Sequence, residues 1–273
     1  MSLAHTNPDG SDGLAATSVT VRFGGLVAVD NMSLYAPVGH LTGLIGPNGA
    51  GKTTPFNAIT GLNHPASGRI SLFGKDITKL SPQARAQRGL GRTFQRMELF
   101  DSLTVAENVA LGKEAGLAGS NPLRHLRGSL SDNKHVAQAR DEALEVVGIA
   151  DLRNRRPADL STGQRRLVEL ARVIAGDFKV LLLDEPSSGL DKRETERFGE
   201  ILRHLVEERG IGILCVEHDM ALVMSVCDYI YVLDFGKPIF EGTTVEVANS
   251  PIVRAAYLGD EEIELDGVTV EVG

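Results

Sequence analysis

The stretch GPNGAGKTTP, from Gly46 to Pro55, decides the fold of this 273-residue chain. Its first six residues contain three glycines, which let the backbone turn its N–H groups inward towards an anion. Residues 30–46 predict two strands broken by Pro37-Val38-Gly39, and a helix is expected to follow to about Gly61. A strand, a glycine-rich turn and a helix N-terminus in this order form a cradle for phosphate groups.

The spacing Gly-x-x-x-x-Gly-Lys-Thr is that of a P-loop, which binds the phosphates of a nucleotide. We expect Lys52 to reach the β- and γ-phosphates and the Thr53 hydroxyl to ligate Mg²⁺. A nucleotide and Mg²⁺ are therefore the predicted cofactors, and the family resemblance described below makes the nucleotide ATP. The residues of this motif that are predicted to surround ATP are Gly46, Asn48, Gly49, Ala50, Gly51, Lys52, Thr53 and Thr54.

Two carboxylates end an apolar segment, VLLLDE, that runs from Val180 to Glu185. An Asp-Glu pair after a strand is more often a solvated turn than a catalytic pair, but behind a P-loop the balance reverses. Asp184 is expected to hold Mg²⁺, and Glu185 to polarise the water that attacks the nucleotide.

Three further polar positions support this chemistry only in combination with the P-loop. Ser161 and Gly163, in LSTGQ, precede a helical pattern and predict an anion site at a helix N-terminus, although Ser161 alone would be a simple N-cap. His218 follows the last long strand, where a group that senses the γ-phosphate is needed. Gln95, in RTFQ, is expected to end a strand and to reach Mg²⁺ or the attacking water.

The wider pattern alternates strands and helices, except for one long insertion. Residues 18–23 alternate as a strand, and residues 67–77 predict a hairpin. Between about residues 98 and 175 strand signals vanish, and helical periodicity predicts an inserted lobe. The later strands, at 180–184, 212–218 and 229–234, alternate with helices at 192–209 and 220–226, which favours a mostly parallel sheet.

Composition restricts the possible partners and compartment. The net charge is −8, from 28 basic and 36 acidic side chains, which argues against a nucleic-acid partner. Cys215 and Cys227 are too few for a disulfide framework and fit a reducing compartment. No apolar run approaches the roughly 18 residues that span a bilayer, and the first residues lack a signal pattern. We expect a cytoplasmic protein that reaches a membrane only through a partner.

The motifs, taken in order, resemble those of the ATP-binding cassette ATPases. The P-loop is followed by RTFQ, LSTGQ, LLLDEP, SSGLD and EHD, and the resemblance covers about residues 16–259. It implies an α/β fold: a P-loop NTPase (RecA-like) core with an N-terminal antiparallel β subdomain and an inserted helical subdomain at about residues 98–175. Residues 1–15 are then expected to be a disordered tail, and residues 260–273 an acidic tail.

The resemblance also assigns roles to single residues. Gln95 becomes the Q-loop glutamine, the motif from Leu160 the signature loop, the motif from Ser187 the D-loop, and His218 the switch histidine. Phe23 matches the aromatic residue that stacks on adenine, although an ordinary strand-end core residue was the alternative. Glu185, His218 and Lys52 would carry the catalysis.

In this family a second ATPase subunit completes each site. The P-loop of one copy faces the signature loop of the other across ATP, in a homodimer or a heterodimer with a related subunit. The residues expected to act on the partner's ATP are Ser161, Gly163, Gln164 and Asp191. Closure on ATP would drive transport through integral membrane permease subunits, with the ATPase on the inner face of the cell membrane.

Longer stretches of the sequence resemble one branch of this family in particular. RFGGLVAVDNMSL, GRTFQRMELFDSLTVAENVALG and the segment from VEHDMALV to IFEGT are similar to the ATPase subunits of branched-chain amino acid importers, which also use an extracytoplasmic substrate-binding protein. The ending AAYLGDEE is shared with lipopolysaccharide-exporter ATPases, so such an exporter remains an alternative. A soluble cassette ATPase without a transport role is a further alternative, but it usually has a long coiled coil or two tandem cassettes.

Two positions depart from the family pattern. Thr162 replaces the first glycine of the signature, while Ser161 and Gly163 are kept. Pro55 stands where the family has a large apolar residue. If Gly51 caps the helix, the proline removes the first helical hydrogen bond, to the Gly51 carbonyl, at a cost of about 1–2 kcal/mol.

Overall fold

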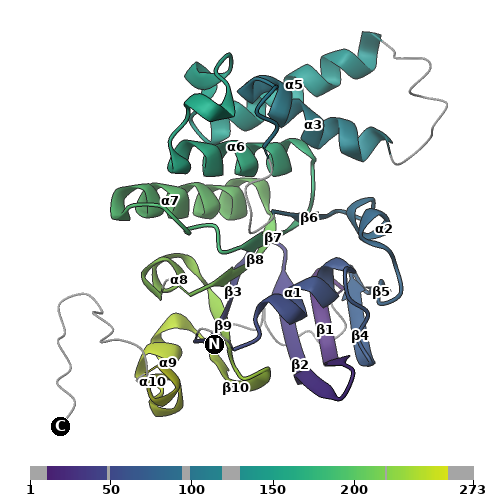
Figure 1. Cartoon of the computed structure of the whole chain (residues 1–273), viewed down its shortest axis with the longest axis vertical. Helices are drawn as coiled ribbons and strands as arrows, with labels where there is room; N and C mark the ends of the chain where they lie inside the picture. The colour runs from purple at the N-terminus through teal and green to yellow at the C-terminus, as the bar shows by residue number, and fades with distance from the viewer. Residues whose placement is uncertain (1–10, 48–49, 94–98, 119–129, 219, 258–273) are drawn as a thin grey trace.

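The structure, a computed structural model, describes residues 11–47, 50–93, 99–118, 130–218 and 220–257. Two sheets and a group of helices make up these residues (Figure 1), so the predicted α/β class with its additional β and helical parts is confirmed. The predicted acidic tail, residues 260–273, lies outside the described residues.

The smaller sheet is antiparallel, in the order β2-β1-β4-β5. Its strands are β1 (Gly13–Phe23), β2 (Leu26–Pro37), β4 (Ser67–Leu72) and β5 (Lys75–Asp76). The predicted limit of the N-terminal tail at residue 15 is wrong, because β1 begins at Gly13 and buries Leu14 and Ala15. A bulge explains the error: Ala16 faces Leu34 while Val19 faces Met32, so alternation breaks near Ser18, whose φ is 49°.

The larger sheet has the order β10-β9-β3-β8-β7-β6 and carries the predicted parallel strands. Its members are β3 (Leu41–Ile45), β6 (Leu90–Arg92), β7 (Val180–Asp184), β8 (Gly212–Glu217), β9 (Tyr229–Asp234) and β10 (Lys237–Gly242). Only β10 is antiparallel to its neighbour. The sequence did not predict β10, because it is an edge strand that is mostly exposed or half-buried.

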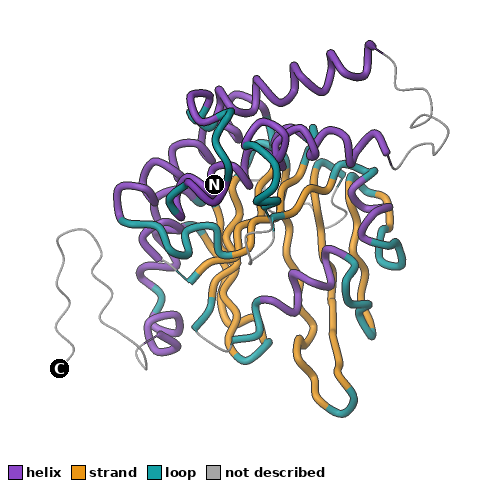
Figure 2. Tube along the Cα trace, turned by 45° about the horizontal axis from the view of Figure 1, so that its top comes forward, coloured by secondary structure: helices purple, strands orange, loops and turns teal. Residues whose placement is uncertain are grey.

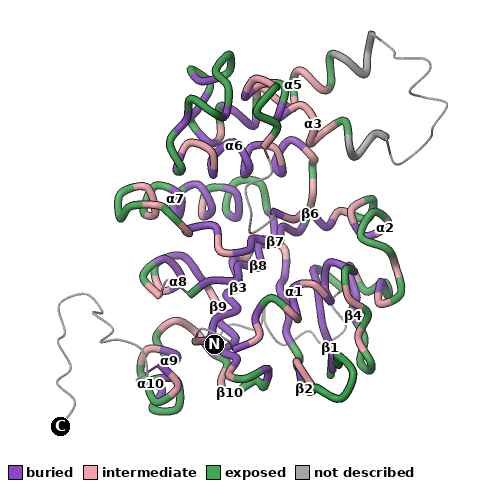
Figure 3. Tube along the Cα trace, viewed as in Figure 1, coloured by how far each residue is buried: buried purple, intermediate pink, exposed green. Residues whose placement is uncertain are grey.

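Both faces of the larger sheet are covered. Consecutive residues along each strand point to opposite faces, and so they pack in two different hydrophobic cores. Leu41, Leu181 and Ile213 pack with α7 (Lys192–Arg209) and α8 (Met220–Val226) in one core. Leu44, Leu182 and Leu214 pack in the other with α1 (Thr53–Thr60) and the small sheet. In Figure 3 the central strands are accordingly buried over most of their length. Because both faces of the sheet are buried, the sequences of these strands are continuous apolar runs and do not alternate with polar residues.

The inserted helical lobe consists of α3 (Val105–Ala118), α5 (Leu130–Val146) and α6 (Thr162–Ala175), with short 3₁₀ turns at Ala150–Leu152 and Pro157–Asp159. α6 buries the predicted apolar face, including Leu167, Leu170 and Ile174, and this face joins the α7 core. α3 crosses α6 closely, because a Cβ on Gly112 would lie 1.8 Å from the Arg172 carbonyl oxygen. Figures 1 and 2 show the lobe stacked beyond α7, at one end of the molecule.

Three short helices complete the described fold. α2 (Pro82–Ala86) is capped by Ser81, whose hydroxyl accepts the Ala84 N–H at 3.3 Å. α9 (Thr244–Asn249) and α10 (Pro251–Tyr257) follow β10 and were not predicted. They lie at the end of the molecule opposite the helical lobe (Figure 1).

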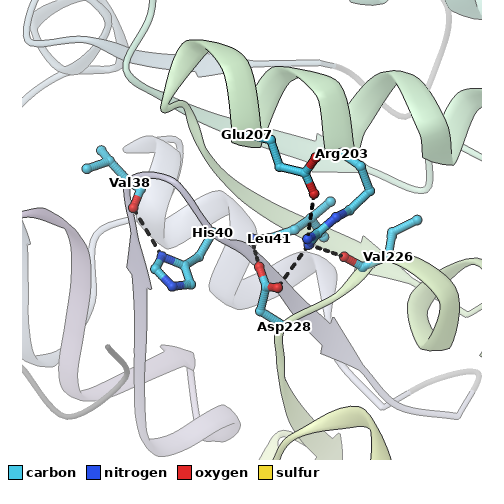
Figure 4. Close-up of polar contacts among 7 residues, drawn as sticks. All are labelled: Val38, His40, Leu41, Arg203, Glu207, Val226 and Asp228. Atoms are coloured by element: carbon cyan, nitrogen blue, oxygen red, sulfur yellow. Dashed lines mark hydrogen bonds and ion pairs between the residues drawn. The ribbon is translucent and has the colours of Figure 1, made fainter. Parts of the chain in front are cut away.

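An ionic network fastens α7 and α8 to the sheet at the start of β3 (Figure 4). Arg203 donates to Asp228 Oδ1 at 2.9 Å, to the Val226 carbonyl at 3.1 Å and to Glu207 at 2.9 Å. Asp228 Oδ2 in turn accepts the Leu41 N–H at 2.8 Å. This network lies at the edge where β3 begins, and the P-loop leaves the opposite edge.

Candidate nucleotide-binding site

The carboxyl ends of three neighbouring strands bring the predicted catalytic residues together. β8 lies between β3 and β7, with Ile45 opposite Glu217 and Asp184 opposite Val216. The P-loop leaves β3, the two-carboxylate turn leaves β7 and the His218 loop leaves β8 at this one edge. In open parallel sheets, ligands bind outside this edge.

The P-loop backbone is shaped by close contacts with the next hairpin. A Cβ on Gly46 would lie 2.2 Å from the Leu233 carbonyl oxygen, and Gly51 has a φ of +84°. The Gly236 N–H, in the β9–β10 turn, donates to the Ala50 carbonyl at 2.8 Å. Glycine is therefore required at two of the predicted positions by tertiary contact and by backbone conformation. Asn48 and Gly49 lie outside the described residues.

Lys52 directs its ammonium group into the loop. Nζ donates to the carbonyls of Gly46 and, at 3.1 Å, of Pro47, and the residue is 7% exposed. Burial lowers the pKa of Lys52, while the carboxylates of Glu185 and Glu217 act in the opposite direction. Its ammonium is thus held within the loop, among the groups expected to meet the phosphates.

The helix cap differs from the expected one. Lys52, not Gly51, is the N-cap of α1, and the Gly51 carbonyl accepts the Thr54 N–H at 3.1 Å. Pro55 is consequently the third residue of the helix, where no intrahelical acceptor awaits an N–H. The expectation that the proline removes a bond to Gly51 is wrong. Thr53, the first helical residue, is exposed.

Asp184 is buried at the end of β7 and is only 2% exposed. Burial raises its pKa to about 6, and the Arg92 guanidinium, 3.8 Å from Oδ2, opposes this shift. Oδ2 has no hydrogen-bond partner among the described residues, and the Asp184 N–H donates to the Thr93 hydroxyl at 3.3 Å. A buried carboxylate oxygen without a donor fits a cation ligand, together with the hydroxyl of the exposed residue Thr53. Gln95, the other expected ligand, lies outside the described residues.

Glu185 occupies a strained backbone position next to Asp184. Its φ is +46°, in the left-handed region that is uncommon for a residue with a side chain. Its N–H donates to the Val216 carbonyl at 2.8 Å, which holds the turn against β8. Oε1 lies 3.9 Å from His218 Nδ1, and the His218 side chain is 46% exposed. The predicted base and the predicted sensor therefore lie side by side, with the histidine facing solvent.

The residues expected to act on a partner's ATP form a second group. Ser161 caps α6 in a capping box with Gln164, and Asp191 caps α7 in a capping box with Glu194. The two caps are in contact, because a Cβ on Gly163 would lie 2.3 Å from Glu194 Oε1. The signature loop and the D-loop thus adjoin, and we call this group the signature surface: Ser161–Gln164, Gly189 and Asp191, of which Gly163 is buried.

Thr162, the departure from the family signature, fits this surface. A Cβ on Gly189 would lie 3.0 Å from Thr162 Cγ2, so the D-loop glycine packs against the threonine. The capping box keeps the Ser161 hydroxyl at 3.2 Å from the Gln164 N–H and Gln164 Oε1 at 3.0 Å from the Ser161 N–H. The local cap expected of Ser161 is therefore present with threonine at position 162.

Phe23 is exposed, which contradicts the alternative of an ordinary core residue. It ends β1, pairs with Leu26, and is 50% exposed, while Leu26 is 66% exposed. An exposed aromatic ring at a strand end remains compatible with the adenine contact that the resemblance implies.

Arg92 belongs to the site but was not predicted. It donates to the Thr60 hydroxyl at 2.9 Å and to Asn57 Oδ1 at 3.3 Å, and its guanidinium lies 4.8 Å from the centre of the Phe56 ring. Since it also faces Asp184, it joins α1 to the end of β7. Arg92 is the first residue of the RTFQ motif, but its contacts depend on tertiary structure and no local pattern pointed to them.

Comparison with known proteins decides the family. A family model described as "ABC transporter" matches residues 29–188, more than half of the chain. The chain belongs to the ABC transporter family. A second model, "Branched-chain amino acid ATP-binding cassette transporter", matches residues 237–263 of this cassette, which include β10, α9 and α10.

Curated relatives of this ABC cassette match it over nearly their whole length. The high-affinity branched-chain amino acid transport ATP-binding protein LivG of Salmonella typhimurium is 39% identical over 250 residues, which are 90% of this chain and 98% of LivG. BraF of Pseudomonas aeruginosa, with the same description, is 37% identical over the same shares of the two chains.

Solved structures agree in fold. The ADP conformation of MJ1267, an ATP-binding cassette of an ABC transporter, has a TM-score of 0.80 and 31% identity, over 91% of this chain and 99% of that one. The dimeric cassette MJ0796, in a post-hydrolysis state bound to ADP and Pi, has a TM-score of 0.71 and 26% identity, over 85% and 98% of the two chains. Within the described part of this cassette, no helix is long and apolar enough to cross a membrane.

Proposed function

We propose that this chain is the ATP-hydrolysing subunit of an importer for branched-chain amino acids or related amides. The observation that carries this proposal is the continuous similarity to LivG and BraF, which extends into the C-terminal segment matched by the branched-chain family model. We place the chain on the inner face of the cytoplasmic membrane, held there by permease subunits. An extracytoplasmic binding protein would deliver the substrate.

The nucleotide would lie across the carboxyl edge of the larger sheet. The P-loop N–H groups and Lys52 would bind the β- and γ-phosphates, and Phe23 would stack on the adenine. Thr53, Asp184 and Gln95 would hold Mg²⁺, which supplies positive charge against the phosphate oxygens when it is bound. The buried Asp184 Oδ2, which has no hydrogen-bond partner among the described residues, supports this assignment.

Hydrolysis would depend on the pair beside the γ-phosphate. Glu185 would orient the attacking water and accept its proton, because it directly follows Asp184 at the end of β7 and its carboxylate lies beside His218. His218, 3.9 Å away, would contact the γ-phosphate and respond to its loss. Lys52 would offset the negative charge that develops as the bond breaks.

A second cassette subunit would complete the site. The signature surface would contact ATP held by the partner's P-loop, because it presents a helix N-terminus of α6 beside the D-loop. The dimeric, ADP-and-Pi-bound cassette MJ0796 shows that a relative of the same fold assembles in pairs. ATP would then be the ligand that closes the dimer, and its hydrolysis would allow reopening.

The test is uptake in cells that lack the gene. We expect uptake of labelled leucine to be lost and to be restored by the wild-type chain but not by E185Q. Short-chain amides and urea, tested in parallel, define the substrate range. Unchanged uptake of every one of these substrates, or loss of lipopolysaccharide from the cell surface instead, would contradict the proposal.

A further inference from the structure

Glu217 is a fully buried carboxylate at the centre of the site, and neither the motifs nor the mechanism above assigns it a role. It is 0% exposed and ends β8, between the strand that leads to the P-loop and the strand that ends in Asp184. Oε1 accepts the Ser187 N–H at 2.8 Å, and Oε2 accepts the His218 N–H at 3.2 Å. The same Oε2 lies 4.0 Å from His218 Nδ1.

The two amide donors belong to different functional loops. Ser187 lies two residues after Glu185 in a turn that the Ser188 N–H closes onto the Glu185 carbonyl, at 3.1 Å. His218 begins the loop after β8. A buried carboxylate loses its hydration and is stabilised only by hydrogen bonds and nearby positive charge. Both amides are therefore held around Glu217, which adds a second tie between the two loops to the bond from the Glu185 N–H to the Val216 carbonyl.

We propose that Glu217 is a positioning residue that holds the Glu185 turn and the His218 loop in register across the γ-phosphate. The inference rests on the roles proposed above for Glu185 and His218. Because Ser187 also begins the D-loop, the same carboxylate links the γ-phosphate side of one subunit to the surface that meets the partner. Loss of this link would displace the reacting groups while leaving the phosphate cradle unchanged.

The test is Glu217→Gln, which keeps the shape of the side chain but replaces one acceptor oxygen with a donor. One of the two amides then loses its acceptor. We expect kcat for ATP hydrolysis to fall roughly 10- to 100-fold, the size of effect that misplaced catalytic groups produce. KM and the affinity for a fluorescent ATP analogue should stay within about threefold, since the two amides that bond Glu217 both lie outside the P-loop. Glu208→Gln, at an exposed position of α7, removes the same charge and should leave kcat unchanged.

A double-mutant cycle separates positioning from a merely structural role. If Glu217 acts through His218, then E217Q should lower kcat much less in an H218A background than in the wild type. A kcat of E217Q within about twofold of wild type would overturn the proposal, and so would fully independent effects in the cycle. A melting-temperature collapse in which kcat and affinity fall together would show a structural role and would overturn it equally.

Further variants keep the test decisive if E217Q does not fold, and they test the proposed function separately. Glu217→Asp keeps the charge but is one methylene too short to reach both amides, so it should show the same separation of kcat from KM even if E217Q does not fold. If neither variant folds, Glu217 is a structural residue and the proposal is wrong. E185Q and H218A with Glu217 intact test the proposed function itself: if both remain active, that function fails, and if only E217Q remains active, this inference alone fails.

Discussion

Pro55 shows how one residue depends on the position of a helix cap. Since Lys52 is the N-cap, the missing N–H of Pro55 falls among the donors that a first turn leaves unpaired. The phosphate-binding N–H groups precede it and are unaffected. Proline is well tolerated at this end of a helix, in contrast to the interior.

We therefore expect Pro55→Leu to change the free energy of unfolding by less than about 1 kcal/mol and to leave ATP affinity unchanged. Ala58→Pro, three residues further along the same helix, is the matched control and should cost about 3 kcal/mol. Thermal melting and nucleotide titration of the purified variants test both expectations. A shift of ATP affinity by more than about tenfold in Pro55→Leu would mean that the proline shapes the phosphate loop.

Glu185→Gln is expected to abolish ATP hydrolysis while ATP binding is retained. The amide keeps the shape of the side chain beside His218 but cannot accept the proton of the attacking water. We expect kcat to fall by at least about 100-fold, as for the loss of a general base. Phosphate-release assays and binding of a fluorescent ATP analogue measure the two effects. Near wild-type hydrolysis would exclude Glu185 as the base.

At the scale of elements, the helical lobe depends on the close crossing of α3 and α6. Gly112 has no room for a Cβ, which would lie 1.8 Å from the Arg172 carbonyl oxygen. Alanine is the better helix former by up to about 1 kcal/mol, so propensity and packing oppose each other at this position. Overpacking costs more, because the contact is with backbone that cannot rotate away.

Gly112→Ala should accordingly destabilise the protein by about 1–3 kcal/mol, in spite of its higher helix propensity. Gly25→Ala is the control, because a Cβ on Gly25 meets no atom within 4 Å. Urea unfolding of both variants decides the sign. A Gly112→Ala variant as stable as the wild type would show that α3 can move away from α6 without cost.

At the scale of the whole molecule, the P-loop group and the signature surface are two halves of a site that two chains would share. We expect E185Q to be monomeric or weakly dimeric without nucleotide and to dimerise with ATP, because ATP fills the polar interface. The double variant E185Q/K52A, which loses a phosphate contact, should remain monomeric under the same conditions. Sedimentation velocity measures the change, and a mass that ATP does not alter would contradict the shared site.

Local sequence patterns determined most of the element types and the motifs of the candidate site. The P-loop spacing, the apolar runs that end in Asp184 and His218, and the helical period of α6 depend on residues close together in the chain. Their element types and a mostly parallel sheet were therefore predictable. The family resemblance rested on the same short motifs, and the comparisons bear it out.

The remaining features depend on contacts between residues that are far apart in the sequence, and only the tertiary structure shows them. The bulge near Ser18 hid the first part of β1, and exposed residues hid the edge strand β10. The burial of Glu217 and the contacts of Arg92 follow from which strands become neighbours, and no local pattern specifies that order. Gly163 and Gly112 are likewise restricted by Glu194 and by the Arg172 backbone, which lie on other segments. A side chain's neighbours across the core depend on the packing of the whole chain, whereas its local conformation depends mainly on adjacent residues.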